Sequence, residues 1–162
     1  MSALTYVEVG ATEAGVLPPG YRHLRYRTAI GRDVFATAAE AVLTWRMHRS
    51  AGITVDTAAE RAAPGVDVTM HLGPLPAPCR VVWVVDEPGR AGWGYGTLPG
   101  HPARGEEAFV VSQGADGTTW FEVTAFSVPA GWLMRAAGPA GRLFQRAYAA
   151  WCARALRRLA NA

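Results

Sequence analysis

The chain has 162 residues, of which 50% are hydrophobic and 18% charged, and its formal net charge is +3. This length favours a single domain over residues 1–162, able to bury a core and enclose a cavity, and the hydrophobic content argues against disorder. The longest apolar runs, such as Val81–Val85, are too short to cross a bilayer, and no signal-peptide pattern opens the chain, so we expect a cytoplasmic protein without a membrane span.

Two compositional features narrow the class further. Cys79 and Cys152 lack the spacing of a disulfide framework or a zinc site, so we expect two buried thiols and neither a metal nor a cofactor. All 16 basic residues are arginine, and no acidic residue follows Glu122, which makes the C-terminus basic. Because basic–aromatic stacking motifs are missing, these arginines indicate a solvated helix face and no nucleic-acid partner.

The N-terminal third predicts one strand and one helix. Residues 21–30 alternate in polarity, which is typical of a strand with one solvent-exposed face. Apolar residues at helical spacing predict a helix over residues 33–49, with Asp33 near its N-terminus and Gly52 at its end. Trp45 lies on the apolar stripe of this helix. His48 follows at i+3, where a surface or hydrogen-bonded histidine is expected.

Further strands fill the middle of the chain. The run over residues 80–86 is the most strand-like, because its β-branched residues continue without alternation, as in a strand buried on both faces. Residues 73–78 predict a proline-rich loop, and residues 114–117 predict a hairpin turn. The predicted strands are Ile53–Arg61, Val66–Leu72, Arg80–Asp86, Ala91–Leu98, Glu106–Ser112 and Thr118–Val128.

The last part of the chain predicts a helical tail. Pro129 is acceptable in a first helical turn, and Pro139 either kinks the helix or restarts it. From Gly141 onward, the sequence predicts an amphipathic helix of about five turns, whose apolar stripe is first a core-facing surface and second a ligand lining. This stripe contains Phe144, Tyr148, Trp151, Cys152, Ala155 and Leu159, with Arg142, Arg146, Ala153 and Arg157 opposite.

The order of a strand, a helix, about six antiparallel strands and a long helix predicts an α+β fold. A curved antiparallel sheet of six to seven strands, wrapped around the C-terminal helix, would bury the apolar stripe of that helix. This arrangement resembles the helix-grip architecture of the START and Bet v 1-like superfamily. The resemblance implies a cavity between the sheet and the last helix, and it leaves the function open.

Residues 94–109, GYGTLPGHPARGEEAF, concentrate polar side chains between glycines and prolines. The glycines at positions 92, 94 and 96 occupy one face of a predicted strand, which permits a sharp bend or the close approach of a backbone or a ligand. The opposite face of the strand carries Trp93, Tyr95 and Thr97. The turn at Pro99-Gly100-His101-Pro102 then leads into two adjacent glutamates.

Glu106 and Glu107 must point to opposite faces of their strand, and we expect Glu107 to point inward because it alternates with Phe109 and Val111. An inward carboxylate needs a partner, or its pKa rises. Two interpretations remain open: a carboxylate–imidazole pair at a cavity mouth, and a structural tie that fixes the bend of a hairpin. The partners available to the carboxylate are Tyr95, Thr97, His101, Arg104 and Arg80.

The same segment carries a resemblance to a known family. YGTLPGHPARGEEAF is similar to the hallmark of the uncharacterised protein family 0548, found in bacteria and plants, and further matching residues lie along nearly the whole chain. The activity of that family is unassigned, and its grouping with helix-grip folds implies the same architecture. Ala103 stands where a glutamate or similar residue is frequent. The residues that the resemblance singles out, without a role, are Tyr95, Thr97, His101, Glu106, Glu107 and Ser127.

The leading hypothesis is a protein that binds a hydrophobic or amphipathic small molecule between its sheet and its C-terminal helix. One alternative is an enzyme of isomerase, cyclase or hydrolase type in the same cavity, with His101, Glu106 or Glu107 as acid or base. Another is an interaction module that docks a partner through the basic C-terminal helix, including Arg146 and Arg157. The predicted ligand-binding residues are Tyr95, Thr97, His101, Glu107, Phe109, Trp83, Trp93, Ser127, Phe144 and Tyr148.

Overall fold

The computed structural model describes residues 1–162 and contains a seven-stranded antiparallel sheet with the strand order β1-β7-β6-β5-β4-β3-β2. The sheet and the long last helix confirm the predicted helix-grip architecture. The strands are β1 (Arg22–Arg32), β2 (Thr54–Asp56), β3 (Asp67–Leu72), β4 (Leu75–Glu87), β5 (Arg90–Thr97), β6 (Ala103–Gln113) and β7 (Thr118–Pro129). The helices are α1 (Ala11–Ala14), α2 (Phe35–Leu43), α3 (Arg46–Ser50), α4 (Trp132–Ala136) and α5 (Pro139–Ala160).

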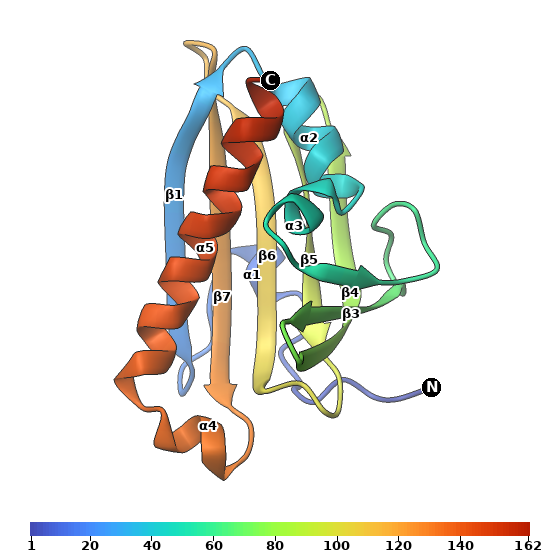
Figure 1. Cartoon of the computed structure of the whole chain (residues 1–162), viewed down its shortest axis with the longest axis vertical. Coiled ribbons are helices and arrows are strands. Elements are labelled where there is room, and N and C mark those ends of the chain that lie inside the picture. Colours follow the sequence, from blue (N-terminus) through green and yellow to red (C-terminus); the bar gives the residue numbers. More distant parts are fainter.

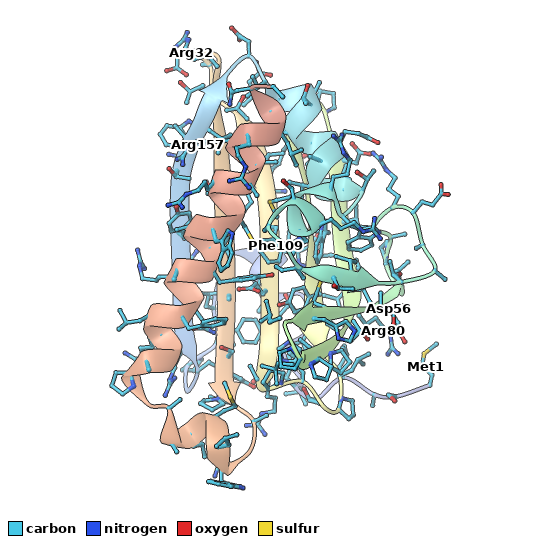
Figure 2. The ribbon with its side chains drawn as sticks, viewed as in Figure 1. Met1, Arg32, Asp56, Arg80, Phe109 and Arg157 are labelled. Carbon is cyan, nitrogen blue, oxygen red and sulfur yellow. The ribbon has the colours of Figure 1, made fainter.

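Three helices cover one face of the sheet, which we call the helix face (Figure 1). α5 runs along the sheet against β1, and α2 and α3 pack beside it. The N-terminal segment with α1 lies on the other side, the far face, against β6 and β7. Phe109 points into the space between the sheet and the helices, where it is fully buried (Figure 2). No helix combines the length and the apolar character needed to cross a membrane.

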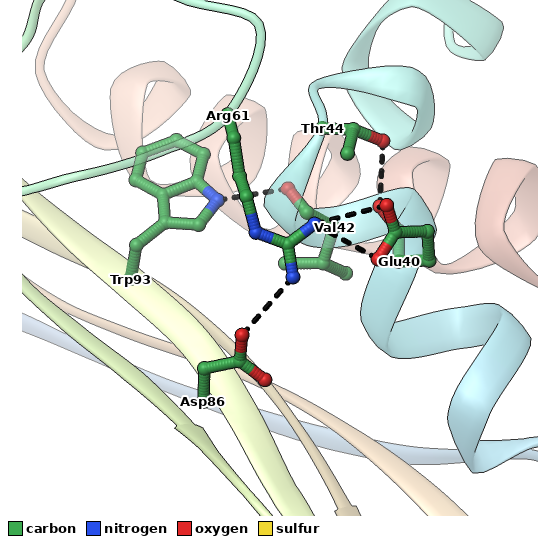
Figure 3. Close-up of polar contacts among 6 residues, drawn as sticks. All are labelled: Glu40, Val42, Thr44, Arg61, Asp86 and Trp93. Atoms are coloured by element: carbon green, nitrogen blue, oxygen red, sulfur yellow. Dashed lines mark hydrogen bonds and ion pairs between the residues drawn. The ribbon is translucent and has the colours of Figure 1, made fainter.

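Hydrogen bonds join α2 to the sheet beneath it (Figure 3). The buried indole N–H of Trp93 donates to the carbonyl oxygen of Val42 at 2.9 Å. Arg61 pairs with Glu40 of α2 at 2.9 Å and with Asp86 of β4 at 3.0 Å. The ion-paired side chains are more than 40% exposed, so they contribute little, and the buried indole is the stronger tie between helix and sheet.

The carboxylate of Glu106 anchors the N-terminal segment on the far face. Oε2 accepts the Tyr6 hydroxyl at 2.6 Å and the Gly10 N–H at 2.8 Å. Oε1 accepts the Thr12 N–H at 3.0 Å and the Thr12 hydroxyl. The indole N–H of Trp83 in turn donates to the Thr12 hydroxyl at 2.9 Å. This buried network therefore ties residues 6–12 to β6 and β4, the two strands on either side of β5.

The glycines on the far face of β5 make room for the aromatic side chains of this network. A Cβ atom on Gly94 would collide with the indole of Trp83, and one on Gly96 would collide with the ring of Tyr6. Glycine at these positions lets both aromatic rings lie directly over the sheet. The space that the missing side chains of these glycines leave is thus occupied by the protein's own aromatic side chains.

The prediction of one continuous helix over residues 33–49 is wrong. α2 ends at Leu43 and α3 begins only at Arg46, because Trp45 has a φ of 69°, in the left-handed region. The strained backbone turns the Trp45 indole toward Ala59, whose carbonyl oxygen accepts its N–H at 2.9 Å. Asp33 likewise has a positive φ, 55°, and caps no helix.

His48 is neither a surface residue nor a hydrogen-bonded one. It is fully buried, and both ring nitrogens lack a hydrogen-bond partner. Its ring packs edge-on against Phe109, with ring centroids 4.7 Å apart. Burial lowers the pKa of His48 to about 3, so the imidazole is neutral and serves as an aromatic core residue.

Two predictions in the middle of the chain need correction. The strand predicted over Ile53–Arg61 is only the short β2. The loop predicted over residues 73–78 is wrong, because β4 begins at Leu75 and includes Pro76 and Pro78. Pro76 and Pro78 lie opposite His71 and Thr69 of β3. The Pro78 carbonyl oxygen points away from β3, where it accepts the Leu98 N–H at 3.0 Å. Because the nitrogen and the carbonyl of a strand residue point to the same side, the proline nitrogens face the region beyond the end of β5 at Thr97 and are not needed as donors to β3.

The C-terminal region also differs in detail. Pro129 is the last residue of β7 rather than the start of a helix. Trp151, placed on the predicted apolar stripe, is 59% exposed, whereas Ala153, placed opposite, is fully buried. The reason is that α5 packs against α2 and α3 as well as β1, and small residues such as Ala149 and Ala153 allow this close helix contact.

Replacing Glu106 by glutamine tests its anchoring role. An amide nitrogen would face backbone and hydroxyl donors, so we expect Glu106→Gln to lower the free energy of unfolding by about 3 kcal/mol. Urea unfolding followed by circular dichroism measures this loss. Glu87→Gln, at an exposed position without a side-chain hydrogen bond, is the control, and equal effects of the two substitutions would contradict the assignment.

Candidate functional site

A cavity of about 460 Å³ lies between the helix face of the sheet and the helices α4 and α5. Strands β3 to β7 form its floor, with Met70 from β3, Ala77 from β4 and Ala125 from β7 among the apolar contributions. Met134 of α4 and Phe144 of α5 line the opposite side. This volume is in the range of pockets that hold small organic molecules.

Glu107 carries the main polar group of the cavity wall. The Tyr95 hydroxyl donates to its Oε1 at 2.7 Å, while its Oε2 has no hydrogen-bond partner in the protein. Burial raises the pKa of Glu107 from 4.5 to about 7, and the hydrogen bond from Tyr95 opposes this rise. The carboxyl group therefore gains or loses its proton near neutral pH.

His101 lines the same cavity but does not pair with Glu107. Its Nδ1 accepts the Ala103 N–H at 2.9 Å, which leaves the proton of the neutral ring on Nε2. Burial lowers the pKa of His101 to about 4, so the ring is neutral at pH 7 and acts as a donor. The partner of the Glu107 carboxylate is Tyr95, and the carboxylate–imidazole pair, one of the two interpretations left open by the sequence, is not formed.

Two predicted hydroxyl residues line the cavity with their oxygens already engaged. Thr97 Oγ1 accepts the Gly105 N–H at 3.0 Å and shares a hydrogen bond with the Thr5 hydroxyl at 2.5 Å. Ser127 Oγ accepts the amide N–H of Gln145 at 2.9 Å, which ties β7 to α5. Both residues therefore fix the walls of the cavity.

The helix α5 contributes two aromatic rings to the cavity. Phe144 and Tyr148 stack with ring centroids 6.3 Å apart, one helical turn from each other. Burial raises the pKa of the Tyr148 hydroxyl, so it stays protonated at neutral pH. Seven of the ten predicted ligand-binding residues thus share the cavity, namely Tyr95, Thr97, His101, Glu107, Ser127, Phe144 and Tyr148.

The other three predicted ligand-binding residues lie outside the cavity lining. Trp93 and Phe109 are fully buried in the core beside it, where they contact each other with ring centroids 5.2 Å apart. Trp83 lies on the far face with its indole bonded to Thr12. Glu106, a candidate acid or base, is among the residues that line the cavity, but its carboxylate lies on the far face, where donors occupy both oxygens.

The cavity also contains residues that the sequence interpretation missed. Met70 and Leu72 were visible as an apolar strand face, but nothing in that alternation distinguishes a cavity wall from a packed core. Met134 belongs to α4, a five-residue helix too short for a periodic signal. Gln145 is recognisable only through its bond to Ser127 across the fold.

Together, the sheet, the long helix and the cavity between them define a protein with the helix-grip, Bet v 1-like fold. A hypothetical protein from Helicobacter pylori superposes with a TM-score of 0.70 at 9% sequence identity, over 98% of this chain and 96% of that one. Norcoclaurine synthase from Thalictrum flavum, solved with dopamine and hydroxybenzaldehyde, superposes with a TM-score of 0.58 at 12% identity, over 86% of each chain. These likenesses show the fold alone.

Sequence similarity identifies the family. Residues 5–155 match the family described as "Domain of unknown function (DUF1990)", and the chain belongs to it. The UPF0548 protein of Deinococcus radiodurans is 35% identical over 178 aligned residues, which cover 98% of this chain and 88% of the relative. The resemblance to family 0548 drawn from the central motif is therefore confirmed.

The raised pKa of Glu107 predicts a specific dependence of stability on pH. Because the folded state favours the protonated carboxyl, folding loses stability as the pH rises from 4.5 through 7. Relative to Glu107→Gln, the wild-type chain should lose up to about 3 kcal/mol over this interval. Denaturant unfolding at several pH values measures the difference, and parallel curves for the two proteins would contradict the burial of this carboxyl.

Proposed function

We propose that the protein binds a hydrophobic or amphipathic small molecule in the cavity between its sheet and α5. The observation that carries this proposal is an apolar cavity of about 460 Å³ whose wall presents one carboxylate oxygen without a protein partner. Such a site favours a ligand that has an apolar body and one well-placed polar group. The Bet v 1-like neighbours support the proposal only at the level of the fold.

The polar groups favour a neutral ligand with an O–H or N–H donor. Glu107 Oε2 accepts such a donor, and the neutral ring of His101 offers a donor of its own to a ligand oxygen. A ligand carboxylate would face the Glu107 carboxyl in a poorly solvated space, which is unfavourable while that group is ionised. Met70 and Phe144 would contact the apolar body of the ligand.

A neutral fluorescent probe tests this proposal. N-phenyl-1-naphthylamine has an apolar ring system and one N–H, and we expect it to bind saturably with increased fluorescence. Ala140→Trp places a large ring at the mouth of the cavity and should weaken probe binding about tenfold. Ala147→Trp is the matched control, because Ala147 is also exposed on α5 but does not line the cavity. Equal affinities of the two variants, or no saturable binding, would refute the proposal.

One observation favours a second candidate, an enzyme in the same cavity. A carboxyl with a pKa of about 7 can both accept and donate a proton at neutral pH, as general acid–base catalysis requires. In this candidate, Glu107 removes or delivers a proton and Tyr95 orients it. Wild-type protein in deuterated buffer would then transfer solvent deuterium into a bound metabolite, whereas Glu107→Gln would still bind the probe and transfer none.

A further inference from the structure

Large apolar side chains are exposed on α4 and the first turns of α5. Trp132 is 79% exposed and Leu133 is 66% exposed on α4, and Leu143 is 72% exposed on α5. Phe144, which lines the cavity with part of its ring, is still 55% exposed. We call these residues of α4 and early α5 the apolar tip. It lies at one end of the long axis of the molecule (Figure 1).

The apolar tip is surrounded by arginines without acidic partners. The ion pairs of the protein involve Arg27, Arg61 and Arg80, and none of these belongs to α4 or α5. No acidic residue follows Glu122 in the sequence. Arg135 of α4 is therefore free to meet an external anion.

A second cleft gathers three more arginines beside the tip. It has a volume of about 330 Å³, and its lining includes Arg22 of β1 together with Arg142 and Arg146 of α5. Arg22 also contacts the carbonyl oxygen of Gly138 at 3.4 Å, which holds it next to the start of α5. A cleft with three guanidinium groups suits a phosphate group.

The C-terminal half of α5 is different. Arg157 donates to the carbonyl oxygen of Ala29 and to the Thr28 hydroxyl, both on β1, at 2.9 and 2.8 Å. Arg158 contacts the carbonyl oxygen of Ser50 at 3.4 Å. Arg157 and Arg158 thus fasten the helix to the fold, and Arg154 is the one arginine of this half that has no partner, whereas Arg142 and Arg146 lie together with Arg22 in the cleft beside the tip.

We propose that the apolar tip docks on the surface of an anionic phospholipid bilayer. Trp132, Leu133 and Leu143 would enter the interfacial layer, while the arginines of the cleft meet lipid phosphates. Exposed tryptophan and leucine beside arginine are the combination that favours shallow membrane binding, and each arginine adds to it electrostatically. The tip is the end of an elongated molecule, a small footprint that suits a lipid surface better than a stable protein interface.

The position of the cavity agrees with this orientation. Met134, Ala140 and Phe144 line the cavity and belong to the same two helices as the tip. Docking would therefore bring the cavity mouth to the bilayer, from which an apolar molecule could enter. The docking itself does not depend on the proposed function, because it requires no ligand in the cavity.

Vesicle flotation tests the docking directly. We expect the full chain to float with vesicles of phosphatidylcholine and phosphatidylglycerol, and much less with phosphatidylcholine alone. Raising the salt concentration should weaken the binding, because it screens the arginines. Absence of binding to the anionic vesicles, or equal binding to both vesicle types, would overturn the proposal.

Paired variants locate the contact. Trp132→Ala/Leu133→Ala should weaken binding about tenfold, whereas Val7→Ala/Val16→Ala, which removes exposed apolar groups elsewhere, should not. Equal effects of these two double variants would overturn the assignment to the tip.

Arg142→Gln/Arg146→Gln should weaken binding about 25-fold, at about fivefold per arginine. The control for charge is Arg46→Gln/Arg90→Gln, at two exposed arginines without a side-chain hydrogen bond. In the absence of lipid, the variants are expected to sediment like the wild-type chain. If the wild-type chain instead forms a dimer that only the tip variants dissociate, and it does not bind vesicles, the tip would be assigned to a contact with a second copy of the chain.

Discussion

The alternation of side chains along β6 is the constraint on which the rest of the structure depends. Because adjacent strand residues point to opposite faces, Glu106 and Glu107 send one carboxyl group to each side of the sheet. On the far face, Glu106 meets several donors of the N-terminal segment and is fully used. On the helix face, Glu107 meets one donor, Tyr95, and keeps an oxygen open to the cavity. The same residue type therefore serves as a structural anchor in one position and as a candidate binding group in the next.

A gradient along α5 explains why a cavity exists beside a tightly packed core. Toward its C-terminus, small residues such as Ala149 and Ala153 are fully buried, and they let α2 and α3 approach closely. Toward its N-terminus, Phe144 and Tyr148 hold the helix over the strands that form the floor of the cavity, and little covers the outer side of the helix. Close packing at one end and bulky side chains at the other leave the space that Glu107 faces.

The sequence predicts most of the strands, the long helix and the direction of Glu107 because these follow from local periodicity. It does not predict the break at Trp45, which depends on a hydrogen bond to the distant Ala59. It also does not predict that Trp83 and Tyr95 lie on opposite faces of the sheet. The face on which Trp83 lies depends on the bulge between Val81 and Trp83 in β4. The central motif is accordingly divided in the structure, with part of it supporting the far face and part lining the cavity.

The central claim is that Glu107 lies in a poorly solvated cavity with one oxygen free. The most direct test is a titration of the glutamate side-chain carboxyl carbons by nuclear magnetic resonance, with Glu107→Gln used to assign the signal. The account predicts that the resonance lost in this variant titrates near pH 7. A titration near 4.5, the ordinary value for glutamate, would show that water solvates this carboxyl freely and would contradict the cavity as described.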